Sequence, residues 1–406
     1  MALFHHCFTP TPSMDIRQPL ALLGGLSPVQ FMRRHWQKKP LLVRQAIPGF
    51  APPVSRADVF ALAAREGVES RLVQLRQGVW SLRHGPLPRR ALPALQQPGW
   101  TLLVQGVDLH DDAVHALMQQ FRFVPEARLD DLMISYASNG GGVGPHFDSY
   151  DVFLLQAHGQ RRWRIGRQKD LTLRADIPLK VLAQFAPEQE FVLDPGDMLY
   201  LPPRYAHDGI AQGECMTWSI GFRAPARAEL ARELLLRIAE DAGDEGDADD
   251  AGDRGRPRRY RDAGQRATAQ PAAMAPRLQD FARAALARAL ARPLALERAL
   301  GEYLTEPKPC VWFEPGADAG ADGAPCHGLR LDRRSRMLYD AQHVFINGES
   351  YRAAGRDAKL MRRLADRRQL GARDLERASA AARQWLCSWC AAGWAHGLAA
   401  DDPALR

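Results

Sequence analysis

A glycine-rich loop that leads into a strand beginning with His146-Phe-Asp148 constrains this chain more than any other feature of its sequence. The loop runs from Gly140 to Pro145, and its glycines allow the backbone to approach a neighbouring segment closely. Side chains two positions apart point to the same face of a strand, so His146 and Asp148 lie on one wall. Both can bind a metal ion, and the pattern therefore raises the question of a third ligand.

The sequence around this loop predicts an antiparallel β domain. After about residue 130 the helical patterns disappear, and short strand-like runs are separated by Gly, Pro and Asp. Many short strands with such turn signals are typical of a closed barrel or a double-sheet jelly roll. The predicted strands cover residues 132–136, 150–156, 160–165, 189–193, 197–201 and 216–222.

The composition indicates where the protein is located more clearly than what it does. The 406 residues, 46% of them hydrophobic, are enough for two or three domains with buried cores. No apolar run approaches the roughly 20 residues that span a bilayer, residues 1–13 lack the pattern of a secretory signal, and six cysteines are scattered along the chain. We therefore expect a cytoplasmic protein with no membrane partner. The net charge of +7 favours contact with nucleic acid but is also common among enzymes, so alone it decides nothing.

Changes in composition divide the chain into three predicted domains. The β domain with an N-terminal extension occupies residues 1–223, a helical region 224–305 and a winged-helix-like domain 306–406. An acidic block followed by a basic one, at about 240–262, is typical of a flexible insertion. Helices are predicted at 227–241, 276–303, 357–370 and 372–394, and strands at 328–339 and 343–351.

The predicted winged-helix-like domain has two possible roles, because some winged-helix domains bind DNA and others bind proteins. We expect a protein-contact or dimer-support role and no direct DNA binding. Cys387 and Cys390 have the spacing of a metal or redox pair, but there is no second pair, so we interpret them as packing residues.

The third candidate ligand lies about 60 residues beyond the first two. A turn at Asp194-Pro-Gly, a strand to Leu201 and a Pro-Pro corner lead to His207. Two imidazoles and one carboxylate leave metal positions open, as in the facial triad of non-haem Fe(II) oxygenases. Zinc accepts the same ligands, but the usual zinc signature on a helix is missing. Two satisfied buried histidines are the structural alternative, and either histidine alone would favour it.

An Fe(II) oxygenase of this geometry also needs two further electrons, which 2-oxoglutarate supplies when it is decarboxylated to succinate. The distal carboxylate of 2-oxoglutarate requires a fixed cation, and Arg suits this task because it binds carboxylates in a bidentate manner. On its strand, Arg161 shares a face with Trp163 and Ile165. We therefore predict that Arg161 points into the barrel and that Arg162 and Arg164 are solvated. Thr217 or Ser219, on one face of the last strand, could donate to the same carboxylate or make an interior hydrogen bond.

At these residues the chain resembles the JmjC ribosomal oxygenases, and specifically their bacterial branch. The resemblance extends over roughly residues 20 to 226. It rests on the glycine loop with His146-Phe-Asp148, Gly159-Gln-Arg161-Arg-Trp, Pro195-Gly-Asp-Met-Leu-Tyr-Leu-Pro-Pro203 with His207, Gln37-Lys-Lys-Pro-Leu-Leu and Gly221-Phe-Arg-Ala-Pro.

The resemblance implies a mainly β catalytic domain, the JmjC/cupin double-stranded β-helix, with a helical dimerisation region and a C-terminal winged helix. It also implies a homodimeric enzyme that uses Fe(II), 2-oxoglutarate and O2 to hydroxylate the β-carbon of an arginine in large-subunit ribosomal protein sixteen. His146, Asp148 and His207 would then hold the iron, and Arg161 the distal carboxylate of 2-oxoglutarate.

A guanidinium substrate requires hydrogen-bond acceptors near the mouth of the barrel. Tyr150, Asp151 and Asp208 are near in sequence, and surface or strand-contact roles are the alternative for all three. We prefer that alternative for Asp151, which shares the face of Phe147 rather than that of the ligands.

Two other functions remain open from the sequence. One is a 2-oxoglutarate oxygenase for a different target, such as a ribosomal histidine, a tRNA base or a small molecule. The other is a non-enzymatic cupin-like regulator that binds nucleic acid. The ligand set together with Arg161 argues against the regulator, because binding alone gives no reason for an open iron site beside an anion clamp.

Overall fold

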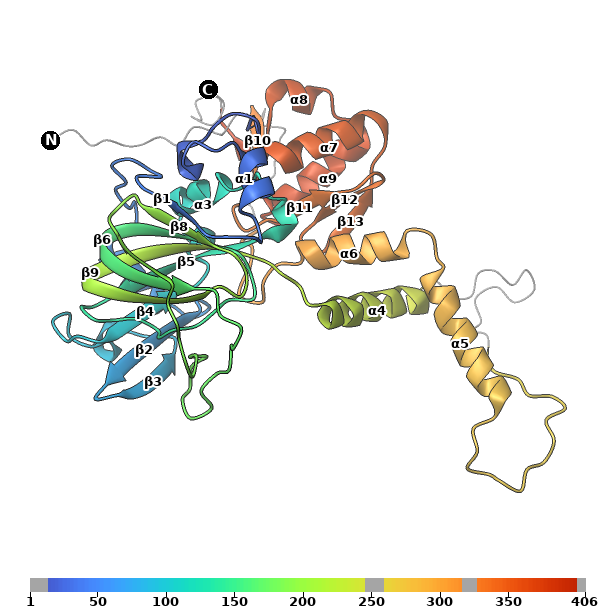
Figure 1. Cartoon of the computed structure of the whole chain (residues 1–406). Helices are drawn as coiled ribbons and strands as arrows, with labels where there is room; N and C mark the ends of the chain where they lie inside the picture. The colour runs from blue at the N-terminus through green and yellow to red at the C-terminus, as the bar shows by residue number, and fades with distance from the viewer. Residues whose placement is uncertain (1–13, 245–258, 316–326, 400–406) are drawn as a thin grey trace. The chain divides into compact units, whose positions relative to one another are not determined.

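The computed structural model describes residues 14–244, 259–315 and 327–399 (Figure 1). The chain divides into two compact units. Of the described residues, the first unit combines 14–224 with 308–315, 327–335 and 366–399, and the second combines 225–244 and 259–307 with 336–365. The part of the predicted insertion from 245 to 258 lies outside the described residues. No described helix is long and apolar enough to cross a membrane.

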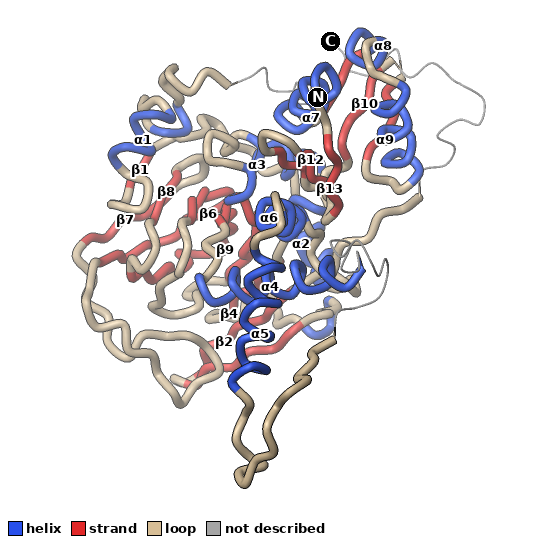
Figure 2. Tube along the Cα trace, turned by 90° about the vertical axis from the view of Figure 1, so that its right-hand side faces the viewer, coloured by secondary structure: helices blue, strands red, loops and turns tan. Residues whose placement is uncertain are grey.

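An antiparallel sheet organises the first unit. Its strands follow the order β1-β8-β6-β9-β5-β4-β2-β3, and β7 pairs with β6. Figure 2 shows β6 and β9 at the centre of this sheet. The strands are β1 (Leu41–Val43), β2 (Ser70–Arg76), β3 (Val79–His84), β4 (Trp100–Val104), β5 (Leu129–Ala137), β6 (Val152–Gly166), β7 (Gln189–Leu193), β8 (Met198–Leu201) and β9 (Ala206–Phe222).

The two long strands β6 and β9 form the framework of the jelly roll. The predicted strands 150–156 and 160–165 are both part of β6, and the predicted strand 216–222 is the last part of β9. The prediction divides β6 near Gly159 and omits the first part of β9, residues 206–215; the backbone φ is 59° at Gly159 and 76° at Gly213. At Gly159 a Cβ atom would lie 2.0 Å from the carbonyl oxygen of Glu214, so only glycine fits.

A bulge in β6 changes which of its residues face the interior of the jelly roll. The pairing with β9 shifts register between Gln156 and Gln160. Side chains on both sides of this bulge nevertheless join one buried cluster, which consists of Val152, Leu154, Trp163, Ile165, Leu193, Leu199 and Leu201. The interior positions are therefore even-numbered before the bulge and odd-numbered after it.

Short helices pack with the sheet around the largest core. Three of them begin at Ser27, Ser55 and Asp111, whose side chains accept hydrogen bonds from backbone N–H groups of the first turn. Phe31 and Trp218 are among the fully buried residues of this core. The helices are α1 (Pro28–Arg34), α2 (Arg56–Ala63) and α3 (Asp112–Gln119), with 3-10 turns η1 (Ala21–Leu23), η2 (Arg89–Ala91), η3 (Val107–Leu109) and η4 (Glu126–Arg128).

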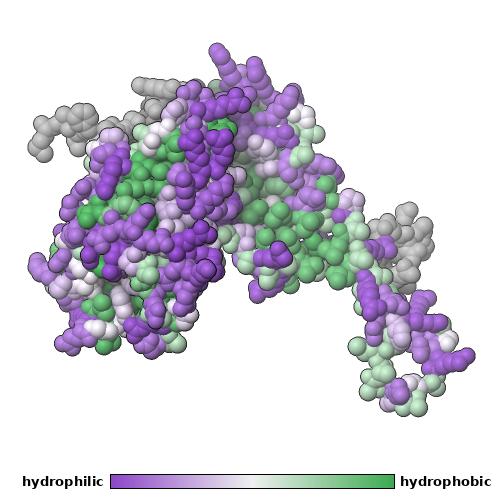
Figure 3. Space-filling model, in the orientation of Figure 1, coloured by the Kyte–Doolittle hydropathy of each residue, from purple (hydrophilic) through white to green (hydrophobic). Residues whose placement is uncertain are grey.

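The second unit is helical with a small sheet. The predicted helix 276–303 is two helices, because Pro293 cannot continue a helix and Leu294 has a φ of 64°. Figure 3 shows hydrophobic side chains gathered over α4 and α6. The elements are α4 (Arg227–Asp244), α5 (Pro276–Leu290), α6 (Ala295–Thr305), the antiparallel strands β11 (Met337–Tyr339), β12 (His343–Ile346) and β13 (Glu349–Arg352), and α7 (Gly355–Arg367), which belongs to this unit up to Ala365.

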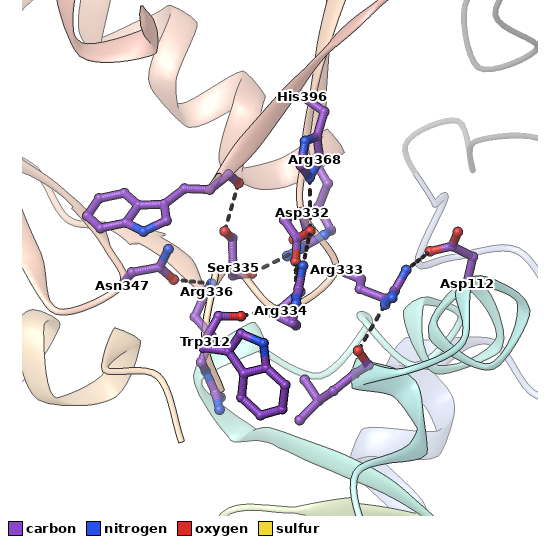
Figure 4. A network of polar contacts seen from close by, with 12 residues as sticks. Asp112, Trp312, Asp332, Arg333, Arg334, Ser335, Arg336, Asn347, Arg368 and His396 are labelled. Carbon is purple, nitrogen blue, oxygen red and sulfur yellow. Dashed lines mark hydrogen bonds and ion pairs between the residues drawn. The ribbon is translucent and has the colours of Figure 1, made fainter. Parts of the chain in front are cut away.

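The C-terminal segments of the first unit form a second small sheet in the order β14-β10-β15. The turn after β10 is held by polar contacts: Arg334 and His396 donate to Asp332, and Arg333 donates to Asp112 (Figure 4). The predicted strands 328–339 and 343–351 are thus four strands, divided between the two units. The elements of the first unit are β10 (Gly328–Leu331), β14 (Gln369–Gly371), α8 (Ala372–Glu376), α9 (Ala380–Ala391) and β15 (Ala395–Leu398).

Candidate metal centre

The two histidines of the predicted triad face each other across an antiparallel backbone pair. The N–H of His146 donates to the carbonyl of His207 at 2.9 Å, and the N–H of His207 donates to the carbonyl of His146 at 2.8 Å. The N–H of Arg204 donates to the carbonyl of Asp148 at 2.7 Å. One ligand atom from each of His146, Asp148 and His207 can be chosen so that all three lie within 4.8 Å of one another. Main-chain hydrogen bonds therefore hold the backbone of all three residues in place.

The hydrogen bonds of both imidazoles leave the same nitrogen available. Nδ1 of His146 lies 2.9 Å from the carbonyl oxygen of Gly144, and Nδ1 of His207 lies 2.9 Å from that of Tyr205. A carbonyl can only accept, so both Nδ1 atoms carry a proton, and Nε2 is the nitrogen of each ring that is left to bind a metal. Burial and the neighbouring His146 lower the pKa of His207 to about 4, so His207 is neutral at physiological pH. Two imidazoles that can bind through Nε2 and a carboxylate fit a divalent transition metal.

Arg161 lies on the same wall as the ligands. The ring of Trp163 is 5.8 Å from the ring of His207, and the guanidinium carbon of Arg161 is 5.7 Å from the Trp163 ring, measured to ring centroids. Arg161 is only 3% exposed, and its Nε and Nη2 atoms have no partner among the described residues. Buried guanidinium donors without a hydrogen-bond acceptor are unfavourable, which indicates that this wall can receive an anion.

The neighbouring arginines differ from Arg161 as the alternation of β6 requires. The side chain of Arg162 is 36% exposed and lies 3.8 Å from Glu190. The sequence predicts that Arg164 is solvated. In the structure it instead donates a hydrogen bond to the buried carboxylate of Asp208 at 2.5 Å. Asp208 therefore already has a cationic partner, which favours its structural interpretation.

The predicted auxiliary hydroxyls line the same part of the sheet. Thr217 is fully buried and donates to Oε1 of Gln156 at 2.9 Å, the interior hydrogen bond given above as its alternative. Ser219 is also buried and pairs with Leu154, a residue of the interior cluster. The role of either hydroxyl towards a co-substrate stays a prediction.

The candidate substrate-contact residues near the mouth differ in their burial and in their hydrogen bonds. Asp151 is fully buried and accepts hydrogen bonds from the Tyr200 hydroxyl at 2.6 Å and from Nε2 of Gln37 at 3.1 Å. This supports the strand-contact role preferred from the sequence. Tyr150 is 39% exposed as a residue, but burial and a hydrogen bond with the Asp148 carboxylate raise the pKa of its hydroxyl, so it contacts a candidate metal ligand.

One feature of the wall was missed from the sequence, where Trp163 served only to mark the inward face of its strand. Its indole Nε1 is buried and has no partner among the described residues, so it is a second donor near Arg161. The ring packs on Gly209, where a Cβ atom would lie 2.6 Å from it. A glycine two residues after a metal-ligand candidate, in a strand, was the signal that could have revealed this packing.

The glycine loop approaches β9 closely, as its composition predicts. A Cβ atom on Gly142 would lie 2.7 Å from the carbonyl oxygen of Gly209. Gly144 has a φ of 80° and lies against Val181 and Trp80. Beyond the loop, the carbonyl of Pro145 accepts a hydrogen bond from the N–H of Leu182 at 2.8 Å.

Two known domain families match this chain. The JmjC domain matches residues 116–230, and the ROXA-like winged helix matches residues 266–396. The chain is 42% identical to ribosomal protein uL16 3-hydroxylase of Escherichia coli over 203 residues, 49% of this chain and 53% of that protein. The sequence match thus spans about half the length of this curated relative.

Solved structures extend the similarity to nearly the whole fold. An X-ray structure of E. coli YcfD has a TM-score of 0.76 and 30% identity, and the match covers 90% of this chain and 96% of that one. A structure of YcfD, described as a ribosomal oxygenase in complex with cobalt and 2-oxoglutarate, has a TM-score of 0.73 and 29% identity, covering 91% and 98%. The predicted jelly-roll fold with a C-terminal winged helix is confirmed. The chain therefore belongs to the JmjC-domain ribosomal oxygenases, in their bacterial branch.

Proposed function

We propose that this chain is an Fe(II)- and 2-oxoglutarate-dependent hydroxylase of ribosomal protein uL16, the large-subunit protein sixteen, and that it modifies the β-carbon of an arginine. The observation that carries the proposal is the buried guanidinium of Arg161, two of whose nitrogens have no hydrogen-bond partner among the described residues, on the same wall as His146, Asp148 and His207. The name of the E. coli relative supports uL16 as the substrate.

The residues present fit both the metal and the co-substrate. His146 and His207 would bind Fe(II) through Nε2, and Asp148 through its carboxylate. Arg161 would hold the distal carboxylate of 2-oxoglutarate, with the indole N–H of Trp163 as a further donor on the same wall. When bound, the iron supplies the activation of O2, coupled to decarboxylation of 2-oxoglutarate to succinate.

The chain's own residues prepare the site in three ways. The carbonyls of Gly144 and Tyr205 fix the imidazole tautomers, so the neutral form of each ring presents the lone pair of Nε2 to a metal. Apolar side chains around Trp163 exclude water from the wall below the ligands. Exclusion of water strengthens the attraction between a buried guanidinium and a carboxylate. Tyr150, which is 39% exposed and has a hydrogen bond with Asp148, would contact the substrate beside the metal ligands.

The test is reconstitution of the full chain without oxygen, with Fe(II) and 2-oxoglutarate, followed by air and mass spectrometry of uL16. We expect one added oxygen on an arginine, lost in the His146→Ala variant. Oxygen on a ribosomal histidine or a tRNA base would identify the other oxygenase functions. If no ribosomal component gains oxygen and His146→Ala behaves like the wild type, the hydroxylase proposal fails.

The proposed enzyme is a homodimer that acts in the cytoplasm, where ribosomes are found. Large apolar side chains are exposed on the helices of the second unit, and such patches are uncommon on monomers unless they bind a partner. A second copy of this chain is the proposed occupant, as the helical dimerisation region of the family implies. The exposed leucines are Leu235, Leu236, Leu278, Leu286, Leu290 and Leu296.

A further inference from the structure

The excess positive charge of the chain is concentrated in its C-terminal part. Residues 327–399 contain 14 Lys and Arg and 7 Asp and Glu, a net charge of +7. This equals the formal net charge of the whole chain, so the remaining residues balance to zero. The charge is therefore a local property, which the overall composition did not reveal.

Within this part, α7 presents a row of cations. Arg356, Lys359 and Arg363 are exposed and are separated by three and four residues, so they project from one face of the helix. The row extends about 10 Å along the helix axis. The opposite face is buried through Leu360 and Leu364, which fixes the helix in the unit. The cations are thus held on a rigid element.

The chemistry of this surface fits phosphate groups better than a protein. None of the large hydrophobic side chains exposed in the described structure lies between residues 340 and 399. Protein interfaces depend on aromatic and aliphatic anchors at their centre. Contacts with a nucleic-acid backbone need only cations at intervals, and they carry no sequence information.

The helix α9 offers no comparable surface for reading bases. Its one cation, Arg383, donates to the backbone carbonyls of Ala378 and Glu376. Base recognition by helices of this class requires several side chains that reach base edges. The position of the charge on α7 therefore points to backbone contact rather than sequence-specific binding.

We propose that Arg356, Lys359 and Arg363, together with the exposed Arg352 just before the helix, form a binding surface for RNA phosphates. The choice of RNA over DNA rests on the proposed function, because a ribosomal protein substrate is found next to ribosomal RNA. The surface would add salt-dependent affinity for ribosomal particles without touching the metal centre.

The test compares two triple variants of the full chain by fluorescence anisotropy with a labelled single-stranded RNA, between about 50 and 200 mM KCl. Arg356→Gln/Lys359→Gln/Arg363→Gln removes the row, and glutamine keeps the helix because its propensity is similar. Each lost contact to single-stranded RNA lowers the slope of log K against log salt by about 0.7, so we expect the slope to fall by about 2.

The control variant, Arg17→Gln/Lys39→Gln/Arg90→Gln, removes the same net charge from exposed positions elsewhere in the described structure. It should keep the slope and affinity of the wild type. Equal losses in both variants, or none in either, would overturn the proposal, as would equally tight binding of duplex DNA or of polyglutamate in place of RNA. Hydroxylation of an isolated uL16 peptide by the α7 variant should be unchanged. A wild type that binds RNA through α7 but never hydroxylates the peptide would separate failure of the proposed function from failure of this surface.

Discussion

Replacing Arg161 by Met should make the metal-free protein more stable and at the same time abolish tight binding of 2-oxoglutarate. The guanidinium is 3% exposed and two of its nitrogens have no partner among the described residues. An unsatisfied buried group costs about 1 to 3 kcal/mol, so its removal should raise the melting temperature by at least about 2 °C. Met fills much of the same volume with apolar atoms.

The loss of binding should be large. Two hydrogen bonds to a charged group contribute at least about 3 kcal/mol together, which corresponds to more than a hundredfold change in Kd. At a concentration 100 times the wild-type Kd, 2-oxoglutarate should stabilise the wild type by about 2.7 kcal/mol and the variant hardly at all. Thermal unfolding and calorimetric titration with Mn(II) in place of iron measure both effects without turnover.

The matched control is Arg162→Met, one residue along the same strand. Arg162 is partly exposed and 3.8 Å from Glu190, and exposed ion pairs contribute less than about 1 kcal/mol. This variant should bind 2-oxoglutarate as the wild type does. A lower melting temperature for Arg161→Met with an unchanged Kd would refute the reasoning, because the guanidinium would then have a structural partner. Equal effects at both positions would contradict the assignment of faces in β6.

Three further outcomes are expected. Trp163→Phe should weaken 2-oxoglutarate binding about tenfold, because it removes one hydrogen bond to a charged group. The control Trp218→Phe removes a similarly buried indole N–H from the main core and should leave the Kd for 2-oxoglutarate unchanged. The indole N–H signals in an NMR spectrum of the Zn(II) form test the contact of Trp163 with 2-oxoglutarate directly. Burial alone would raise the pKa of Asp197, but hydrogen bonds from two backbone N–H groups and Arg44 outweigh it and lower the pKa. Asp197 therefore stabilises the fold above about pH 4 and loses this effect as the pH falls through its lowered pKa. Asp197→Asn should lower the free energy of unfolding by about 1 to 3 kcal/mol at pH 7. Urea unfolding should show a smaller difference from the wild type in acid. Leu236→Glu should shift the chain from dimer to monomer in light scattering while its metal affinity persists; an unchanged mass would argue against the exposed leucines as the interface.

The metal-site candidates could be proposed from sequence because their signals are local. The alternation around Arg161 depends only on strand geometry. His146 and Asp148 could be proposed from their residue types and spacing, but the strand predicted for them is wrong, because β6 begins at Val152 and His146 forms only an isolated bridge with His207. The environment of Asp151 could not be predicted in the same way, because one of its hydrogen-bond partners, Gln37, lies 114 residues away. Strand pairing brings such residues together, and a single sequence does not record it.

Other features that the prediction missed also have a local signal in the sequence. The helical region 276–303 contains Pro293, which divides α5 from α6. The prediction ends one strand before Gly159 and includes no strand at 206–215, whereas β6 and β9 continue through bends at Gly159 and Gly213. In both cases the residue was visible, but its effect depended on neighbouring segments.

The bulge in β6 makes the direction of Arg161 depend on the backbone path as well as on the sequence. Because the interior positions change from even to odd between Gln156 and Gln160, loss of the bulge at constant chain length would turn Arg161 outward and bring Arg162 to the interior. Deletion of one residue together with the bulge would restore regular alternation, and Arg161 would keep its direction. A one-residue deletion in this segment should therefore be tolerated only where it removes the bulge itself, and Arg161 and Arg162 should not be regarded as interchangeable cations.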